Sequence, residues 1–596
     1  MQYEAPLSDL RFAMRASGAL DAVLTLPAYR ELSIDTVDAV LDEAGKFFTD
    51  AVAPRNHSAD KEGVRFDDGR VIVPVAIKDA WRQYAASGWT GLHAPESVGG
   101  QGLPKVLAAA VCEMLNASNL ALGSGLLLCD GAIEALLLAG SDEQKAVFLP
   151  PLVSGAWSGT MNLTEPQAGS DLAQVRTSAV PDGGQYRLRG QKIFITFGEH
   201  DITGNILHFV LARLPDAPTG VKGISLFVCP KFLADEAGAY TVRNDIRCLA
   251  TEHKLGIHAS PTCVLSFGDE EGAVGYLIGE ANKGLEYMFH MMNAARFTVG
   301  MQGIGIAERA YQSASAYAKV RVQGTPAGAS SAAGPMPIIE HPDVRRQLLT
   351  MRANIEASRA VALTIAAAID SANCSHESEE RGRQKRIAEF LVPVHKGHCS
   401  ELAVEIASIA VQVHGGMGFV EETGVAQYYR DARILPIYEG TTAIQANDFV
   451  ARKTLRDGGR VARDLISSMR STASELQSSA DEEIAAAGSL LADAVQRFDQ
   501  ALDWMLSRAK NLPETFTAAV PYLRLTGFVL GGWQMARALQ HAKRERTHQH
   551  ADKDFLDAKI AIAQFYLDAI LPRTASLLVE VTRGSARVLR MDAASF

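Results

Sequence analysis

Cysteine is scarce in this chain and forms no recognisable pattern. The 596 residues include seven cysteines, at positions 112, 129, 229, 248, 263, 374 and 399, and no Cys-x-x-Cys pair. Disulfide frameworks use even numbers of cysteines, and structural zinc sites need closely spaced ones. The sequence therefore predicts neither kind of site, and its scattered thiols favour a reducing compartment.

The chain also lacks an excess of positive charge and a long uninterrupted hydrophobic run. It has 58 Lys and Arg against 68 Asp and Glu, and the net charge of −10 disfavours nucleic acid as a partner. The most apolar stretch, residues 117–140, is interrupted by Asp130 and Glu134, so we expect a buried pair of helices and no membrane span. Glu4 and Asp9 stand where a secretory leader would need basic residues. These features predict a cytoplasmic protein.

What the chain does have is the composition of an ordinary globular protein. Hydrophobic residues make up 47% of it and charged residues 21%, which excludes disordered and fibrous classes. A chain of this length suggests roughly four domain-sized units.

The spacing of apolar residues changes from helical to strand-like and back along the chain. Residues 37–53 and 105–115 have apolar positions three and four apart, as in amphipathic helices. Helical spacing returns over 284–455 and again over 460–596. The β-rich runs lie between these parts, at 186–189, 192–196, 206–213, 224–229 and 263–267.

These segments predict a mainly α protein with a central antiparallel sheet or small barrel. No helix-length segment separates the β-rich runs, which disfavours the parallel sheet of a dinucleotide-binding fold. Gly324–Pro337 has the composition of a flexible surface loop. The predicted parts are an N-terminal arm (1–34), an N-terminal helical domain (35–158), a middle β domain (159–282), a helical bundle domain (283–455) and a C-terminal helical extension (456–596).

Four motifs contain the residues best suited to chemistry. They are MNLTEPQAGSDL (161–172), KIFIT (192–196), QVHGGMGF (412–419) and YEGTTAIQ (438–445). The first is a Gly- and Ser-containing loop whose backbone N–H groups could approach a ligand, although plain loops have the same composition. Phe194, in the second motif, would by itself more often be a core residue.

The fourth motif carries a carboxylate next to the start of a predicted helix. Thr441 has the chemistry of an N-cap, and Glu439 stands just before it. Such a carboxylate is either a surface charge that complements the helix dipole or a base held rigidly beside a ligand. The spacing alone does not distinguish the two.

Together with RVQG (321–324), and in this order on an α-β-α background, the motifs resemble those of the acyl-CoA dehydrogenase family. The resemblance covers about residues 35–455. The opening segment and the helices after residue 455 are similar to a long bacterial subgroup with a C-terminal helical extension. The resemblance implies an FAD flavoprotein oxidoreductase of fatty acid β-oxidation and lipid metabolism, which converts an acyl-CoA thioester to a trans-2-enoyl-CoA.

The resemblance also implies residue roles at the acyl-CoA. Glu439 matches the family's base, which takes the α-proton while flavin N5 takes the β-hydride. That α-proton is weakly acidic, so the reaction needs a dry site that raises the carboxylate pKa and stabilises the developing enolate. Ser170, Arg296 and Gly440 match positions beside the substrate. Some relatives carry the base immediately before Arg296, where this chain has Ala295.

Residues that match FAD-binding positions of the family occur in all the motifs. Relatives cover the flavin with the strand that contains Phe194, and their equivalent of Arg321 meets the FAD pyrophosphate across a dimer interface, so a homodimer at least is implied. The insertion after Arg321 replaces the family's usual sequence there. The matched positions are Met161, Leu163, Thr164, Gly169, Ser170, Phe194, Ile195, Thr196, Arg321, Gln412, Val413, His414, Gly415, Gly416, Thr441 and Ala443.

Several alternatives stay open at this stage. The family implies an electron-transfer flavoprotein as electron acceptor, whereas an acyl-CoA oxidase would use the same glutamate and FAD with oxygen. A catalytically silent relative would instead bind nucleic acid or act as a scaffold. The substrate is 3-methylthiopropionyl-CoA or a medium- or long-chain acyl-CoA, because a single methylene changes discrimination by only about 1 to 3 kcal/mol.

Three other motifs are assigned to the fold. GMQGIG (300–305) follows a helical segment, so helix packing explains it better than a dinucleotide-binding loop. His395 and His398 lie i, i+3 on one predicted helix without a nearby carboxylate, so no metal is predicted. The basic segment 541–550 is interpreted as a solvated helix end, with anion binding as the alternative.

Overall fold

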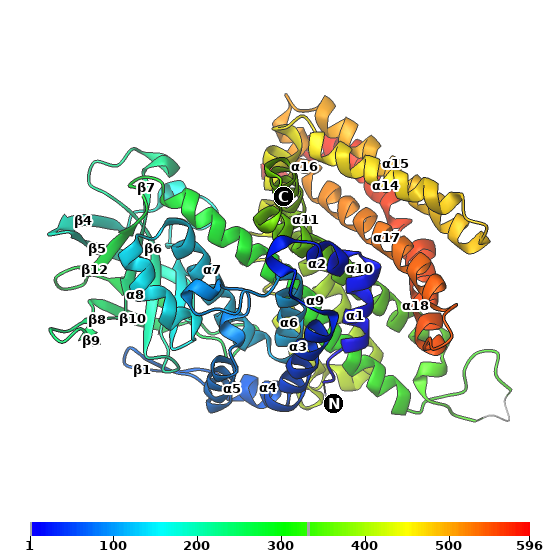
Figure 1. The fold of residues 1–596 in the computed structure, drawn as a ribbon, viewed down its shortest axis with the longest axis horizontal. Coiled ribbons are helices and arrows are strands. Elements are labelled where there is room, and N and C mark those ends of the chain that lie inside the picture. The colour runs from blue at the N-terminus through cyan, green and yellow to red at the C-terminus, as the bar shows by residue number, and fades with distance from the viewer. Residues whose placement is uncertain (1–2, 331–333) are drawn as a thin grey trace. The chain divides into compact units, whose positions relative to one another are not determined.

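A computed structural model of the chain describes residues 3–330 and 334–596 (Figure 1). They form two compact units, each described here by itself. The first unit comprises Met1–Thr49, Pro104–Ala117 and Val299–Phe596, and the second comprises Asp50–Leu103 and Ser118–Thr298. The predicted class, mainly α with a β domain and an appended helical part, is confirmed. The five-part division of the sequence remains a prediction.

An eight-stranded sheet forms the centre of the second unit. Its strands run in the order β10-β11-β5-β12-β7-β6-β3, and β4 pairs with β5 and β6. The strands are β3 (Trp157–Asn162), β4 (Ser178–Asp182), β5 (Gln185–Thr196), β6 (Asn205–Arg213), β7 (Ile224–Pro230), β10 (Ile246–Thr251), β11 (Thr262–Phe267) and β12 (Ala273–Ile278). All the predicted β-rich runs lie in this sheet. The two runs at 186–196 are one continuous strand, β5.

The sheet departs from the predicted antiparallel order at β3. β3 pairs with β6 in parallel, from Trp157 opposite Asn205 to Asn162 opposite Val210. The chain between these two strands contains β4 and β5, which is long enough for the return that a parallel pair needs. β3 is buried on both sides, so its sequence has no alternation that would have identified it as a strand.

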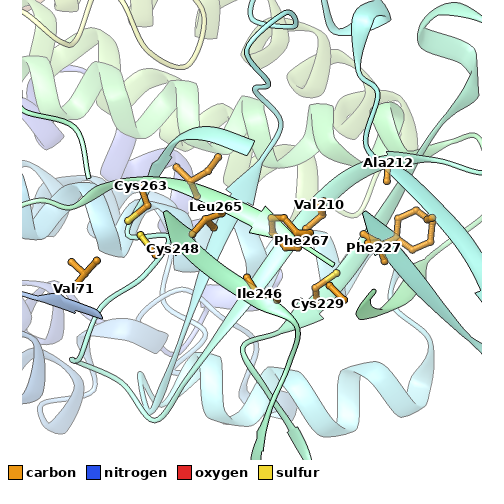
Figure 2. Close-up of a cluster of buried hydrophobic side chains, with 14 residues drawn as sticks. Val71, Val210, Ala212, Phe227, Cys229, Ile246, Cys248, Cys263, Leu265 and Phe267 are labelled. Atoms are coloured by element: carbon orange, nitrogen blue, oxygen red, sulfur yellow. The ribbon is translucent and has the colours of Figure 1, made fainter. Parts of the chain in front are cut away.

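The core of the sheet is a cluster of apolar side chains that includes three of the cysteines (Figure 2). Cys229, Cys248 and Cys263 are at most 4% exposed and pack among residues such as Phe227 and Phe267. Burial raises the pKa of the Cys229 thiol, so this cysteine behaves as a small hydrophobic residue. The seven cysteines are all free thiols, as predicted.

Helix α7 (Leu120–Ala139) packs against strand β3. It is one helix, so the expectation of a helix pair over 117–140 is wrong. Two described helices, α7 and Ser378–Phe419, are long and apolar enough to cross a membrane, but 83% of the apolar window of α7 is buried. A Cβ on Gly159 would lie 2.5 Å from the Ala132 side chain, so the close approach of β3 to α7 requires glycine.

The first unit is built on two long helices, α10 (Pro342–Cys374) and α11 (Ser378–His414), which pack against each other. Helix α9 (Gly284–Val320) begins in the second unit and ends in the first. The smaller helices of this unit are α1 (Leu7–Ala16), α2 (Ala19–Leu24), α3 (Ile34–Phe47), α6 (Lys105–Ser118), α12 (Val425–Ala432) and α13 (Thr442–Asp448).

The C-terminal extension is part of the first unit. Its helices are α14 (Arg460–Gln477), α15 (Glu482–Ser507), α16 (Leu512–Thr517), α17 (Ala519–Glu545), α18 (Lys553–Phe565), α19 (Arg573–Val579) and α20 (Ser585–Val588). Figure 1 shows α14, α15 and α17 as long neighbouring helices. α17 packs on α10 and α11, and a Cβ on Gly527 would lie 2.4 Å from the His398 ring. His398 is thereby a buried packing residue, and burial lowers its pKa to about 3.

The predicted loop at Gly324–Pro337 is closed at its base by backbone hydrogen bonds. The Gln323 N–H donates to the Met336 carbonyl at 3.0 Å, and the Ile338 N–H donates to the Arg321 carbonyl at 2.7 Å. Residues 331–333 of this loop lie outside the described residues.

Candidate active site

The YEGT motif forms a tight turn ahead of α13 in the first unit. Glu439 and Gly440 both have a left-handed backbone, with φ of 53° and 86°. A Cβ on Gly440 would lie 2.6 Å from the Gln445 side-chain nitrogen, so this position requires glycine for space as well as for φ. The turn ends at Thr441, whose hydroxyl accepts a hydrogen bond from the Ile444 N–H at 3.3 Å and caps α13, as predicted.

Two buried side chains hold the carbonyl groups of this turn. Gln445 is fully buried, and its amide nitrogen donates to the carbonyl oxygens of Glu439 at 3.0 Å and Gly440 at 3.2 Å. Lys396 on α11 is also fully buried, and its Nζ donates to the carbonyl oxygens of Leu435 at 2.8 Å and Gly440 at 2.6 Å. The backbone around Glu439 is therefore fixed by α11 and α13 together.

A third connection joins the start of α13 to α11. The Thr442 hydroxyl donates to Glu401 Oε1 at 2.6 Å, and the Thr442 N–H donates to the Pro436 carbonyl at 3.0 Å. The Tyr438 hydroxyl donates to the side-chain oxygen of Gln302 on α9. Ala443, the residue after Thr442, is exposed.

The predicted residues at the ends of α9 and α11 lie close together in the first unit. The rings of Tyr317 and His414 stack with their centroids 4.4 Å apart and their planes 23° apart. Arg321 comes one helical turn after Tyr317 and is exposed, as are Gln412, Gly415 and Gly416 beside His414. Val413 is buried.

His414 itself is buried and neutral. Its Nδ1 pairs with the Ala410 carbonyl at 2.8 Å, and burial lowers its pKa. Nε2 of His414 has no hydrogen-bond partner in the described chain. A Cβ on Gly415 or Gly416 would have no atom within 4 Å, so the backbone beside the histidine is open to a ligand.

In the second unit, the loop after β3 is fastened to β5 by a buried ion pair. The Lys192 ammonium group donates to Glu165 Oε1 at 2.8 Å and to the Leu163 carbonyl at 3.1 Å. Glu165 also accepts hydrogen bonds from the N–H and the hydroxyl of Thr177. The Ile193 N–H donates to the Thr164 carbonyl at 2.9 Å, so the loop runs against β5 just before Phe194.

The structure therefore brings most of the predicted second-unit residues together. Met161 is buried at the end of β3, Leu163 and Thr164 are half-buried, and Gly169 and Ser170 are exposed in the loop. Phe194 is 58% exposed and has a φ of 59°, whereas its neighbour Ile195 is buried. Phe194 is thus an exposed aromatic residue on the strand, and the expectation that it would more often be core does not hold here.

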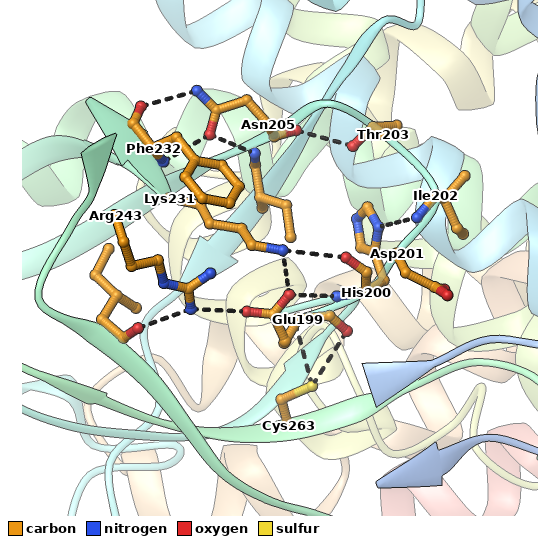
Figure 3. A network of polar contacts seen from close by, with 12 residues as sticks. Glu199, His200, Asp201, Ile202, Thr203, Asn205, Lys231, Phe232, Arg243 and Cys263 are labelled. Atoms are coloured by element: carbon orange, nitrogen blue, oxygen red, sulfur yellow. Dashed lines mark hydrogen bonds and ion pairs between the residues drawn. The ribbon is translucent and has the colours of Figure 1, made fainter. Parts of the chain in front are cut away.

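A polar network holds the chain that follows the KIFIT motif (Figure 3). Glu199 pairs with Lys231 and with Arg243, the latter at 3.0 Å, and its N–H donates to Cys263 Sγ at 3.3 Å. Burial and the Lys231 charge lower the pKa of His200 to about 3, so this histidine is neutral. The network ties the end of β5 to β7 and β11.

Arg296 lies on α9 and is only 3% exposed. Its guanidinium group is 3.4 Å from the Asn293 side-chain oxygen. Met288 and Met291, on the preceding turns, are fully buried, and Met291 packs beside Gly131 of α7. These methionines are therefore core residues of the second unit.

Sequence reasoning missed Lys192, Glu165, Lys396 and Gln445. All four are buried polar residues that support the backbone of a predicted motif. Lys396 stands inside the apolar run LVPVHKGH. A lysine is rarely buried without a specific partner, so this position is a sequence signal for a supporting role of Lys396.

Family models of the acyl-CoA dehydrogenases match consecutive parts of the chain. The N-terminal domain model matches residues 35–156, the middle domain model 160–269 and the C-terminal domain model 282–454. A fourth model, acetyl-CoA dehydrogenase C-terminal like, matches residues 465–592. The chain belongs to the acyl-CoA dehydrogenase family.

Characterised relatives are similar to this acyl-CoA dehydrogenase over nearly its whole length. The 3-methylmercaptopropionyl-CoA dehydrogenase of Ruegeria pomeroyi is 50% identical over 575 residues, which cover 96% of each chain. A butyryl-CoA dehydrogenase of Syntrophomonas wolfei is 34% identical and covers 96% of this chain and 95% of its own.

A solved structure has the same fold and contains FAD. It is an acyl-CoA dehydrogenase of Bacillus anthracis complexed with FAD, with a TM-score of 0.74 at 21% identity, covering 95% of this chain and 90% of that one. The present protein is an FAD-dependent oxidoreductase that acts on the CH–CH group of an acyl-CoA, and the resemblance seen in the sequence motifs is confirmed.

Proposed function

We propose that Glu439 is the base of this acyl-CoA dehydrogenase. The observation that supports this proposal is the conformation of the turn. Glu439 has a left-handed backbone, and the side chains of Gln445 and Lys396 donate hydrogen bonds to the carbonyls of Glu439 and Gly440. Non-glycine residues keep such a conformation only where the surroundings enforce it, and they cluster at functional sites.

The reaction places two requirements on the residues of this chain. The α-proton of a thioester must be taken by a carboxylate at the right distance, and the negative charge that develops on the thioester oxygen must be stabilised by hydrogen-bond donors. Glu439 supplies the carboxylate, and its own backbone N–H, fixed by the same turn, supplies a donor. FAD, when bound, supplies the acceptor for the β-hydride.

The exposed groups of both units fit FAD. In the second unit, the exposed Phe194 offers an aromatic face, and Leu163, Thr164, Gly169 and Ser170 lie on the adjoining loop. Aromatic faces stack on planar ring systems such as a flavin, and Gly and Ser residues let backbone N–H groups come close to it.

In the first unit, the exposed Arg321 follows Tyr317 by one helical turn, and the Tyr317 ring stacks on His414, which precedes the open backbone of Gly415 and Gly416. Arginine recognises phosphate groups with paired N–H donors. We assign this cluster to the pyrophosphate and adenosine half of the FAD of a second subunit, and thereby a homodimer at least. Thr441 and Ala443 are assigned to the same cofactor.

The proposed substrate is 3-methylthiopropionyl-CoA, with a medium- or long-chain fatty acyl-CoA as the alternative. The relative that is 50% identical carries this substrate in its name. Ser170, Arg296 and Gly440 are assigned to substrate binding. The proposed acceptor is an electron-transfer flavoprotein, and oxygen is the alternative that the experiment has to exclude.

An anaerobic titration of the purified flavoprotein tests this function. Acyl-CoAs from 3-methylthiopropionyl-CoA to palmitoyl-CoA are added while the flavin absorbance is followed. We expect bleaching by one chain class and slow reoxidation in air. Fast oxygen consumption would identify an oxidase, and no bleaching by any acyl-CoA would contradict the proposed function.

A further inference from the structure

Lys396 is a fully buried lysine, and burial disfavours a charged side chain. It lies in the middle of α11 with no exposed surface, between Val394 and the packing residue His398. Removing an ammonium group from water is costly unless hydrogen bonds replace the lost solvent. Lys396 makes such bonds to the turn that contains Glu439, and a neutral residue of the same size would have packed here without that cost.

The two carbonyl groups that Lys396 binds stand on either side of Glu439. Leu435 lies at the start of the segment that leads into the turn, and Gly440 follows Glu439 directly. One ammonium group thus fixes both ends of a six-residue segment. Gln445 donates to the carbonyls of Glu439 and Gly440, so side chains of two helices fix the peptide groups that follow Glu439.

We propose that Lys396 is a positioning residue for the dehydrogenation: its ammonium group holds the Leu435–Gly440 segment in the conformation that presents Glu439 to the substrate. This inference rests on the proposed role of Glu439. Lys396 also places a positive charge against the carbonyl of Gly440, the residue that follows Glu439. Such a charge favours the ionised form of the base, which is the form that accepts a proton.

Two other ionisable side chains bond at this turn. Glu401 on α11 accepts the Thr442 hydroxyl, and Tyr438 pairs with Gln302 of α9. His395, on the turn of α11 before Lys396, has its Nδ1 3.4 Å from Cys399 Sγ. Lys396 is therefore the cation that these contacts place against the turn.

The test compares Lys396→Met, Lys396→Arg and the control Lys385→Met, which removes an exposed lysine of the same helix. Flavin content, the dissociation constant of the substrate and the rate of anaerobic flavin reduction are measured for each. We expect K396M to bind FAD and substrate like the wild type but to reduce flavin about 10- to 100-fold more slowly, because small displacements of a base have effects of this size. K385M should match the wild type.

Two readouts separate positioning from a general structural role. The acid limb of the reduction-rate profile should shift to higher pH in K396M and return toward the wild-type position in K396R. Exchange of the α-hydrogens of a non-oxidisable acyl-CoA analogue with deuterated water should slow in parallel with reduction. This exchange reports proton removal without any change of the flavin.

Each result decides the inference. Wild-type reduction and an unshifted acid limb in K396M, with an inactive Glu439→Gln, would overturn the role of Lys396 and leave that of Glu439 intact. An active E439Q would instead overturn the proposed function. If K396M does not hold FAD, Lys396→Gln is measured, whose amide can still donate to the turn. Loss of FAD from K396Q as well would contradict a positioning role.

Discussion

Six non-glycine residues of the described chain have a left-handed backbone, and two of them are Phe194 and Glu439. Each such conformation costs on the order of 1 to 3 kcal/mol, so the surroundings must enforce it. For Glu439 they are the hydrogen bonds of Gln445 and Lys396. For Phe194 they are the pairing of the next residue, Ile195, with Cys263 of β11. In both cases, contacts of the neighbouring residues hold the residue in its left-handed conformation.

Replacing Phe194 by alanine tests the exposed aromatic face. Stacking of aromatic rings contributes about 0.5 to 1.5 kcal/mol beyond area burial, so F194A should weaken FAD binding about 2- to 12-fold. Fluorescence titration of the apoprotein with FAD measures this effect. Phe66→Ala, at another partly exposed phenylalanine of the second unit, is the control and should leave the affinity unchanged. Equal affinity of F194A and wild type would remove Phe194 from the flavin site.

At the residue scale, the sequence predicted the motifs better than it predicted their supports. Glu439 and Thr441 could be singled out because the YEGT motif and the N-cap are both recognised from neighbouring residues in the sequence. The partners of Lys396 and Gln445 could not be predicted, because they are backbone carbonyls whose positions depend on how α11 and α13 pack.

At the element scale, strand β5 and the loop after β3 act as one piece, because Lys192 and Glu165 join them. Burial alone would raise the pKa of Glu165, but the Lys192 charge and the hydrogen bonds it accepts lower that pKa to about 2. Both side chains are at most 3% exposed. Removing one partner of such a buried pair costs about 3 to 5 kcal/mol of unfolding free energy.

The lowered pKa predicts how stability depends on pH. The unfolded chain titrates Glu165 near its ordinary value, so the unfolded state binds more protons than the folded state at acid pH. The contribution of Glu165 is therefore complete above about pH 4.5 and is lost as the pH falls toward 2. Glu165→Gln should flatten this part of the profile of unfolding free energy, measured by urea denaturation. Parallel acid profiles for both proteins would contradict the assignment.

The sequence predicted four of the eight strands of this sheet, β5, β6, β7 and β11, and the failure at β3 has a physical reason. Strands β6, β7 and β11 are rich in β-branched and aromatic residues and were recognised. β3 was missed because only Trp157 and Thr160 of WSGTMN are aromatic or β-branched, and it is a strand through its pairing with β6 and its packing on α7. Tertiary contacts determined this element more than its own propensity did.

Ion pairs between the basic segment 541–550 and acidic residues of the extension argue against the alternative that this segment binds an anion. Lys543 bonds both oxygens of Asp481 at 2.7 Å, and Arg546 pairs with Asp557. These charges are balanced within the extension, as expected of a solvated helix end.

On the scale of the whole molecule, the two ends of the chain are joined inside the first unit. Lys559 of the C-terminal extension is 1% exposed and bonds Asp9 of the N-terminal arm and, at 2.9 Å, Glu356 of α10. Arg352 bonds the same two carboxylates. Burial raises the pKa of Asp9, but the charges of Lys559, Arg359 and Arg352 together outweigh burial, and the pKa is lowered. The extension is therefore an integral part of this unit.

Replacing Lys559 by methionine tests this connection. K559M removes the lysine that bonds both Asp9 and the buried Glu356, and we expect a loss of about 3 to 5 kcal/mol of unfolding free energy and a lower melting temperature. Lys553→Met, at the exposed start of the same helix, is the control and should stay within about 0.5 kcal/mol. A melting temperature of K559M equal to that of K553M would show that the two ends are not coupled through this lysine.

The sequence indicated both the arm and the extension but not their connection. Asp9 and Lys559 are 550 residues apart, and each lies on an amphipathic helix where a charged residue is ordinary. Only the packing of α1, α10, α17 and α18 makes them buried partners. Long-range ion pairs of this kind carry no local signal.

The most direct test of the account is anaerobic single-turnover reduction of Glu439→Gln by the acyl-CoA that bleaches the wild type best. The account predicts that E439Q binds FAD and acyl-CoA normally, reduces the flavin at least about 1,000-fold more slowly, and does not exchange the α-hydrogens of the substrate. Flavin reduction by fully loaded E439Q at a rate near that of the wild type would contradict it.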